Sequence, residues 1–231
     1  MHDIYLTDQY AELNPTWHEE DSPWKARQIE AIIRKNRLSF DTLCEVGCGT
    51  GEILLNLSRS FPKAHFTGYE VSPHAYQRAR TKETGRVSFQ LADILEEKNS
   101  TTFDIVVIAD VIEHVEDYIS FIKGLRACGR YKIFHIPLDL SVQSVLRAWP
   151  IANLRENVGH LHYFFKDTAL ATLRGCGYSI IDHTYTASRL ELPNQALSST
   201  LMRLPRRLLY SIHPDLAVRI LGGYSLLVLA E

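Results

Sequence analysis

A glycine-rich turn between a short apolar run and an amphipathic segment constrains this chain more than any other feature. Residues 42–46 have the composition of a buried strand, and Gly47, Gly49 and Gly51 follow at alternate positions. A strand, a tight turn and a helix start in this order form the nucleotide-binding crevice of open α/β sheets. Glycine lets the backbone lie directly against a ligand. The turn therefore predicts a binding site for a nucleotide-like cofactor.

The spacing of these glycines distinguishes two classes of cofactor. The dinucleotide fingerprint is G-x-G-x-x-G, whereas here the third glycine comes one residue early and Glu45 precedes the first. A carboxylate at this position would repel a pyrophosphate but can accept hydrogen bonds from an ammonium group. The pattern closely resembles the first motif of the class I S-adenosylmethionine-dependent methyltransferases. The resemblance implies that the amino-acid part of the cofactor is held by Glu45, Gly47, Cys48, Gly49 and Gly51.

Two further acids follow later strands of the same crevice. Residues 65–70 predict a second strand whose final residue, Glu70, comes about twenty residues after the turn, where such sheets place a carboxylate against a ribose. We therefore expect Glu70 to accept from ribose hydroxyls, with Val71 beside it; a solvated charge is the alternative. In the resembled family, the next strand end binds adenine, which assigns Asp93 to the amino group and Ile94 to the ring. A turn or N-cap aspartate would look the same in the sequence.

A second motif follows the apolar run at residues 104–109, which is typical of a central parallel strand buried on both faces. The sequence Asp110-Val111-Ile112-Glu113-His114 resembles the post-strand motif of ubiquinone- and menaquinone-type methyltransferases. This resemblance implies that Asp110 and Val111 lie beside the cofactor. His114 is the first candidate for a general base because an imidazole titrates near neutrality, and His160 and His162 are second candidates.

Some quinone-type O-methyltransferases are thought to bind a divalent ion through an acid-x-x-Glu-His arrangement, which Asp110, Glu113 and His114 approximate. The shorter Asp110 side chain makes the match worse. We favour a site without metal, in which Asp110 lies by the methionine part of the cofactor and Glu113 braces the following helix.

The order of elements predicts a Rossmann-like, doubly wound α/β fold in one domain. We expect a mostly parallel seven-stranded sheet whose last strand is antiparallel. The parts are an N-terminal arm and helix (1–40), a cofactor-binding half (41–137) and a substrate-side half (138–231) with a helical insert (186–223). Helices are expected near residues 23–37, 117–127, 141–148 and 167–174, and Pro193, Pro205 and Pro214 should separate two or three helices of the insert.

The arm and the insert each allow two interpretations. Tyr10, Trp17 and Trp24 either pack on the core helix or form a lid over the site. The insert either shapes the acceptor site or makes a subunit contact, because it is far too long for a hairpin loop. Residues 203–209 of the insert are basic and apolar, which suits binding to a membrane surface. The commoner explanation is a helix whose charged side faces solvent while its apolar stripe packs in the core.

Composition limits the partners. The chain has 231 residues, a formal net charge of −2 and four cysteines without a C-x-x-C pair. The charge gives no reason to expect a nucleic-acid partner. The cysteines suggest reduced thiols, and neither a secretory signal nor a membrane-spanning run is visible, so we expect a cytoplasmic protein.

We therefore predict a methyltransferase that uses S-adenosylmethionine, leaves S-adenosylhomocysteine, and modifies O, N or C of a metabolite, lipid or saccharide. A nicotinamide-dependent oxidoreductase and a cofactor-binding protein without catalysis are the alternatives. The sequence does not identify the acceptor, and a homodimer stays open.

Overall fold

Seven strands form one sheet in the described part of the chain, in the order β3-β2-β1-β4-β5-β7-β6. The computed structural model describes residues 14–17, 19–97, 102–192 and 202–231. The strands are β1 (Thr42–Val46), β2 (His65–Glu70), β3 (Val87–Leu91), β4 (Phe103–Ala109), β5 (Gly129–Pro137), β6 (Ile180–Thr186) and β7 (Ser225–Ala230). Strand β7 is antiparallel to both of its neighbours and the pairings among β1 to β5 are parallel, which confirms the predicted sheet.

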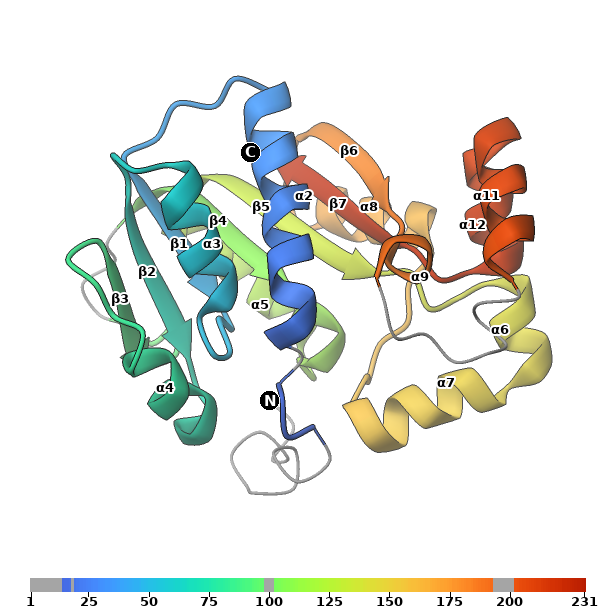
Figure 1. Ribbon diagram of the computed structural model, residues 1–231, viewed down its shortest axis with the longest axis horizontal. Coiled ribbons are helices and arrows are strands. Elements are labelled where there is room, and N and C mark those ends of the chain that lie inside the picture. The colour runs from blue at the N-terminus through green and yellow to red at the C-terminus, as the bar shows by residue number, and fades with distance from the viewer. Residues whose placement is uncertain (1–13, 18, 98–101, 193–201) are drawn as a thin grey trace.

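Helices cover both faces of the sheet (Figure 1). The helices before the last two strands are α2 (Ser22–Lys35), α3 (Glu52–Ser60), α4 (Pro73–Arg80), α5 (Tyr118–Gly124), α6 (Val142–Arg147), α7 (Trp149–Asn153) and α8 (Lys166–Gly175). The insert holds α9 (Ser188–Glu191), α11 (Arg203–Ile212) and α12 (Pro214–Leu221). Short turns are η2 (Glu19–Asp21), η3 (Ile112–His114), η4 (Leu125–Cys128) and the π-helical η5 (Leu154–Val158).

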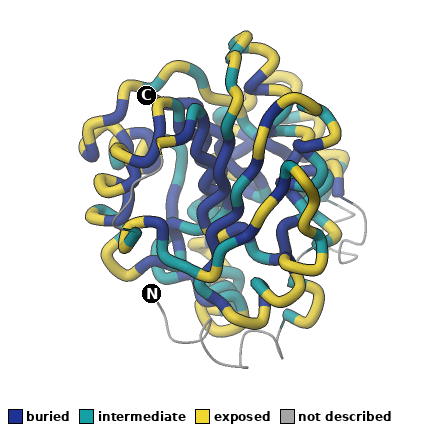
Figure 2. Tube along the Cα trace, turned by 90° about the vertical axis from the view of Figure 1, so that its left-hand side faces the viewer, coloured by how far each residue is buried: buried dark blue, intermediate teal, exposed yellow. Residues whose placement is uncertain are grey.

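Strand β4 shows why its residues form a continuous apolar run. Ile105 and Val107 pack with α2 and α3 on one face, whereas Val106 and Ile108 pack with α5 and α8 on the other. Successive side chains of a strand point to opposite faces, so a strand covered on both sides needs apolar residues at every position. Figure 2 shows the result as a band of buried residues along the strands with exposed residues outside it.

The predicted strands and most helices are confirmed to within a few residues, with two corrections. Pro205 lies within the first turn of α11 and does not separate helices, because the amide of a first-turn residue has no intrahelical acceptor to lose. Helical structure also continues past the predicted end at residue 148, through α7 and η5. Pro214 opens α12 as expected. Tyr10 and Pro193 lie outside the described residues.

Among the described residues, no helix combines the length and the apolarity needed to cross a bilayer.

Candidate functional site

The glycine turn joins β1 to α3 in left-handed conformations, with φ of +55° at Gly49 and +81° at Gly51. A Cβ added to Gly51 would lie 2.4 Å from the Phe89 ring, so packing on β3 requires glycine there. A Cβ added to Gly49 would meet no atom within 4 Å in the described structure. Gly49 therefore faces open space, as expected where a ligand lies against the backbone.

Glu70, at the end of β2, fixes the shape of this turn. One carboxylate oxygen accepts a hydrogen bond from the Gly49 amide at 2.7 Å. The other oxygen accepts from the amides of Val71 at 2.9 Å and Ser72 at 2.8 Å. Burial raises the pKa of Glu70, against the three amides that lower it. The side chain thus couples the ends of β1 and β2, a role that the sequence did not indicate, and its contact with ribose stays a prediction.

Glu45 lies in β1 directly below the turn and is only 1% exposed. Its Oε2 has no hydrogen-bond partner in the described structure. Burial raises the pKa of Glu45 well above its ordinary value; Lys25 opposes this effect and Glu70 adds to it. A buried carboxyl group without a partner is costly, and a cation that reaches it removes that cost. The Glu45 side chain therefore suits the ammonium group of a nucleoside that carries an amino acid, such as S-adenosylmethionine. The open space at Gly49 suits the rest of that ligand.

Asp110 follows β4 and holds a network that ties the N-terminal helix to the sheet. Its carboxylate contacts Lys25 Nζ at 2.7 Å and His135 Nδ1 at 2.6 Å, and His135 Nε2 lies 2.9 Å from the Thr186 hydroxyl. Burial alone would raise the pKa of Asp110, but His135 and Lys25 hold it well below its usual range. Burial alone would lower the pKa of Lys25, but Asp110 and other acids raise it. Asp110 is therefore an ionised, fully paired carboxylate.

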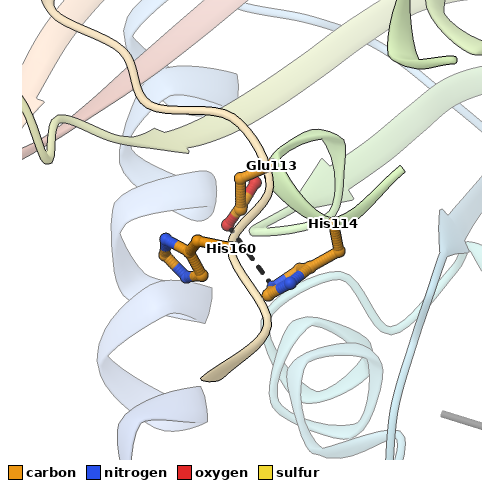
Figure 3. A group of neighbouring side chains, drawn as sticks. All are labelled: Glu113, His114 and His160. Carbon is orange, nitrogen blue, oxygen red and sulfur yellow. Dashed lines mark ion pairs between the residues drawn. The ribbon is translucent and has the colours of Figure 1, made fainter. Parts of the chain in front are cut away.

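The side chains of Glu113, His114 and His160 lie close together, Glu113 and His160 buried and His114 partly buried (Figure 3). Glu113 and His114 come from η3, and His160 comes from the loop after η5. The two imidazole rings meet edge to face with centroids 4.8 Å apart, and His114 Nε2 lies 3.8 Å from Glu113 Oε1. Neither carboxylate oxygen of Glu113 has a hydrogen-bond partner in the described structure. Burial, followed by the charge of Asp110, raises the pKa of Glu113 well above its ordinary value.

The two histidines are oriented through their Nδ1 atoms. His160 Nδ1 lies 2.7 Å from Asp139 Oδ2, and His114 Nδ1 lies 3.1 Å from the Gly159 carbonyl. In each case the partner is an acceptor, so Nδ1 carries the proton and Nε2 keeps its lone pair. Burial and the neighbouring His160 lower the pKa of His114 to about 3. Both rings thus present a basic nitrogen when neutral, but His160 is hydrogen-bonded to a carboxylate, Asp139, whereas the Nδ1 partner of His114 is a backbone carbonyl.

These groups border one cavity of about 320 Å³, a size typical of small-molecule sites. It brings together ten of the residues that the sequence singled out, namely Glu45, Gly47, Cys48, Gly49, Glu70, Val71, Asp110, Val111, His114 and His160. Gly51, Asp93 and Ile94 do not border it: Ile94 is buried in the core, and Asp93 accepts from the Leu95 amide at 2.9 Å. The adenine role of the last two stays a prediction.

The N-terminal arm and the insert also reach this cavity. Trp17, Trp24 and Lys25 line it from one side, and Ser188 and Leu192 line it from the insert. The Trp24 indole nitrogen donates to Glu191 at 2.6 Å, which joins the arm to α9.

Sequence reasoning missed Lys25 and Asp139. Asp139 had a usable signal because it follows a strand that ends at Pro137, whereas nothing in the sequence placed Lys25 beside β4. The expectation that Glu113 braces the next helix is wrong: Asp117 caps α5 by accepting from the Ser120 amide at 3.0 Å.

Glu113, His114 and His160 form a cluster whose ligand-type atoms lie within 4.8 Å of one another, so these residues are the candidates for holding a cation. Ligand atoms around a tetrahedral zinc ion are about 3.4 Å apart, given metal–ligand distances of about 2.1 Å. The cluster is wider than such a shell. Asp110, the third ligand suggested by the sequence, is occupied by Lys25 and His135.

Comparisons with known proteins agree with this geometry. A family model described as "Methyltransferase domain" matches residues 17–183. The ubiquinone biosynthesis O-methyltransferase of Colwellia psychrerythraea is 32% identical over 145 residues, which cover 59% of this chain and 58% of that protein. The chain spans between 25% and 58% of the length of curated relatives that it matches.

Two solved structures share the fold. A methyltransferase in complex with the Trm112 activator of Haloferax volcanii superposes with a TM-score of 0.66 at 15% identity, over 96% of this chain and 92% of that one. The N-methyltransferase NodS of Bradyrhizobium japonicum, crystallised with S-adenosylhomocysteine, gives a TM-score of 0.59 at 18% identity, over 97% and 98%. With a family match over more than half of its length and this fold, the chain belongs to the class I S-adenosylmethionine-dependent methyltransferases.

Proposed function

We propose that this protein transfers a methyl group from S-adenosylmethionine to O, N or C of a small molecule, such as a metabolite, lipid or saccharide. The observation that carries the proposal is that one cavity is lined by Glu45, whose buried Oε2 has no hydrogen-bond partner in the described structure, by the open glycine turn and by two oriented histidines. The cavity volume suits a small acceptor. A matched relative named for O-methylation in ubiquinone biosynthesis supports the same class of substrate.

The cofactor side of the cavity binds and orients. Glu45 would accept from the ammonium group, the backbone at Gly47 and Gly49 would lie against the methionine part, and Glu70 keeps the turn in shape. When bound, S-adenosylmethionine supplies an electrophilic methyl group on a sulfonium. The protein then needs to hold the acceptor in line with that group, which lowers the entropic part of the barrier.

On the acceptor side, we assign the general base to His160. Asp139 fixes the tautomer that leaves Nε2 free, and the same carboxylate stabilises the imidazolium that forms when Nε2 takes a proton from the acceptor. His114 is held neutral, so its role is to orient the acceptor through Nε2. From the sequence, His114 ranked first because it follows the central strand and because an imidazole titrates near neutrality; we reverse that order because His160, unlike His114, is hydrogen-bonded to a carboxylate.

We further propose that the reaction needs no metal. The ligand-type atoms of Glu113, His114 and His160 lie up to 4.8 Å apart, wider than the shell of a bound ion, and the Asp110 carboxylate is taken by Lys25 and His135.

The proposal is tested by mass-spectrometric detection of S-adenosylhomocysteine formed from S-adenosylmethionine with a panel of phenols, amines, polyols and lipid extracts. We expect acceptor-dependent product and no reduction of NAD with any of them. Hydride transfer from an acceptor to NAD, without S-adenosylhomocysteine, would establish the oxidoreductase instead. Binding without turnover on any acceptor would leave the protein as a cofactor binder.

A further inference from the structure

Exposed apolar side chains gather at one end of the molecule. Of the twelve large apolar residues that are exposed in the described structure, nine belong to the segment of α6 and α7 and to α11 and α12. They are Val142, Val145, Leu146, Trp149, Leu204, Leu208, Ile212, Leu216 and Ile220, and we call them the apolar face. The helices that carry them lie together beyond β6 and β7, away from α3 and α4 (Figure 1).

The segment of α6 and α7 turns its apolar side outward. Ser144 is buried and bonded to Ser141, whereas Val142, Val145 and Leu146 are exposed, Leu146 at 81%. Trp149, the first residue of α7, is also exposed, at 65%. Residues at intervals of three and four share one side of a helix, so the outward side is apolar and the inward side polar. This is the reverse of the pattern that a solvent-facing helix shows.

Helix α11 likewise turns apolar side chains outward and a polar side chain inward. Arg206 is buried, while Leu204, Leu208 and Ile212 form an exposed i, i+4, i+8 stripe, with Ile212 at 80%. Helix α11 packs on α12, and α12 packs on α6. The Gln143 side chain donates to the Leu221 carbonyl at 3.0 Å, which joins α6 to the end of α12. The stripes therefore belong to neighbouring helices of one surface.

Helices α6 and α11 carry arginines, and α6, α7 and α11 carry no acid. Residues 140–155 contain Arg147 and Arg155 and no acid, and residues 202–214 contain three arginines and no acid. Asp215 on α12 is paired with Lys166 and with the Tyr185 hydroxyl. Arg147 and Arg207 are exposed, whereas Arg206 is buried, so Arg147 on α6 and Arg207 on α11 are the arginines of these helices that can meet an anionic surface.

We propose that the apolar face docks on an anionic lipid bilayer, with α6 and α11 lying in the plane of the interface. Amphipathic helices bind membranes by burying leucine, isoleucine and tryptophan at the acyl boundary while arginine pairs with anionic headgroups. A second copy of the chain is a poorer occupant. A two-fold interface buries the same face of both copies, and α6, α7 and α11 offer no acid to pair with the arginines of the other copy. The inference is independent of the proposed function, because docking requires neither cofactor nor turnover.

The test is co-sedimentation of the full chain with vesicles of phosphatidylcholine alone and of phosphatidylcholine mixed with phosphatidylglycerol. We expect binding to the mixed vesicles, weakened by salt, and little binding to the neutral ones. Ile212→Thr should lower the partition coefficient by about fivefold or more, because it removes buried apolar surface. Arg207→Glu should lower it by a similar factor on mixed vesicles.

Ile181→Thr is the matched control: the same substitution at an exposed isoleucine on β6. It should leave vesicle binding unchanged. Absent binding, equal binding to both vesicle types, or equal loss in Ile181→Thr and Ile212→Thr would overturn the proposal. Light scattering provides a second measurement: a dimer that Ile212→Thr converts to monomer, with no vesicle binding, would assign the apolar face to a second copy and also overturn it.

Discussion

The two sides of the cavity are built in different ways. On the cofactor side, the acids after β2 and β4 are held by short backbone bonds and ion pairs, as Glu70 is by three amides and Asp110 is by Lys25 and His135. On the acceptor side, His160 lies on a loop after a π-helical turn, and Ser188 and Leu192 come from the insert. The carboxyl ends of sheet strands suit the cofactor, whose shape is constant. Loops and inserts suit the acceptor, which differs between relatives.

The largest effect on ligand binding should come from a side chain that fills the open space at the glycine turn. Gly49→Val places a branched side chain in the open space at the turn and in a left-handed conformation, so we expect S-adenosylhomocysteine binding to be lost. Calorimetry checks this. Gly85→Val is the control, because a Cβ there also meets no atom within 4 Å in the described structure but lies outside the cavity. Retained binding in Gly49→Val would show that the ligand does not lie at this turn.

The next effect belongs to the acceptor side alone. His160→Ala should lower turnover by about 10²–10⁴, the usual scale for a general base, and leave S-adenosylhomocysteine affinity unchanged. Asp139→Asn should lower turnover less and alter its pH profile, while His183→Ala, at an exposed histidine of β6, should change nothing. EDTA should have no effect. Loss of activity on chelation, restored by Mg²⁺ or Zn²⁺, would instead establish a metal at Glu113, His114 and His160.

A smaller effect should come from Glu70, which supports the turn. Glu70→Ala removes the acceptor of three amides and the expected ribose contact, so cofactor affinity should weaken by about 1–3 kcal/mol. Glu96→Ala, at an exposed acid after the next strand, is the control. Unchanged affinity in Glu70→Ala would mean that the turn keeps its shape without this carboxylate.

The smallest effect concerns acid stability on the acceptor side. The pKa of His114 is about 3 in the folded protein and near its ordinary 6.5 in the unfolded chain. The unfolded chain therefore binds more protons between these values, and the stability contributed by neutral His114 is present above pH 6.5 and lost as pH falls toward 3. Acidification from about pH 6.5 to 5.5 should cost about 1 kcal/mol through this group. Urea unfolding in EDTA at both pH values checks this. Acidification should lower the free energy of unfolding less in His114→Asn than in the unsubstituted protein, whereas His183→Asn should behave like the unsubstituted protein. Equal losses in all three proteins would contradict the burial argument.

The sequence predicted the cofactor side better than the acceptor side, for physical reasons. Alternating and continuous apolar runs mark strands directly, and Glu45, Glu70 and Asp110 each lie at a strand end, so the cavity position follows from topology. The Asp139–His160 pair joins residues 21 apart through a loop, and the Lys25–Asp110 pair joins residues 85 apart. Such contacts depend on packing rather than on local pattern.

The helical insert is a second case in which packing could not be predicted from local pattern. Its apolar spacing predicted helices correctly, but spacing alone does not show which stripe faces the core. In α11 Arg206 is buried, whereas Leu204, Leu208 and Ile212 are exposed, which only the structure could reveal.

The most direct test of the account is calorimetric titration of S-adenosylhomocysteine at mildly acidic pH in two buffers of different ionisation enthalpy. Because Glu45 is buried and its pKa is raised in the free protein, an arriving ammonium group should ionise it. The account predicts binding with net release of a proton, and loss of that release together with weaker binding in Glu45→Gln. Tight binding of NAD with no heat from S-adenosylhomocysteine, or S-adenosylhomocysteine binding that Glu45→Gln leaves unchanged, would contradict it.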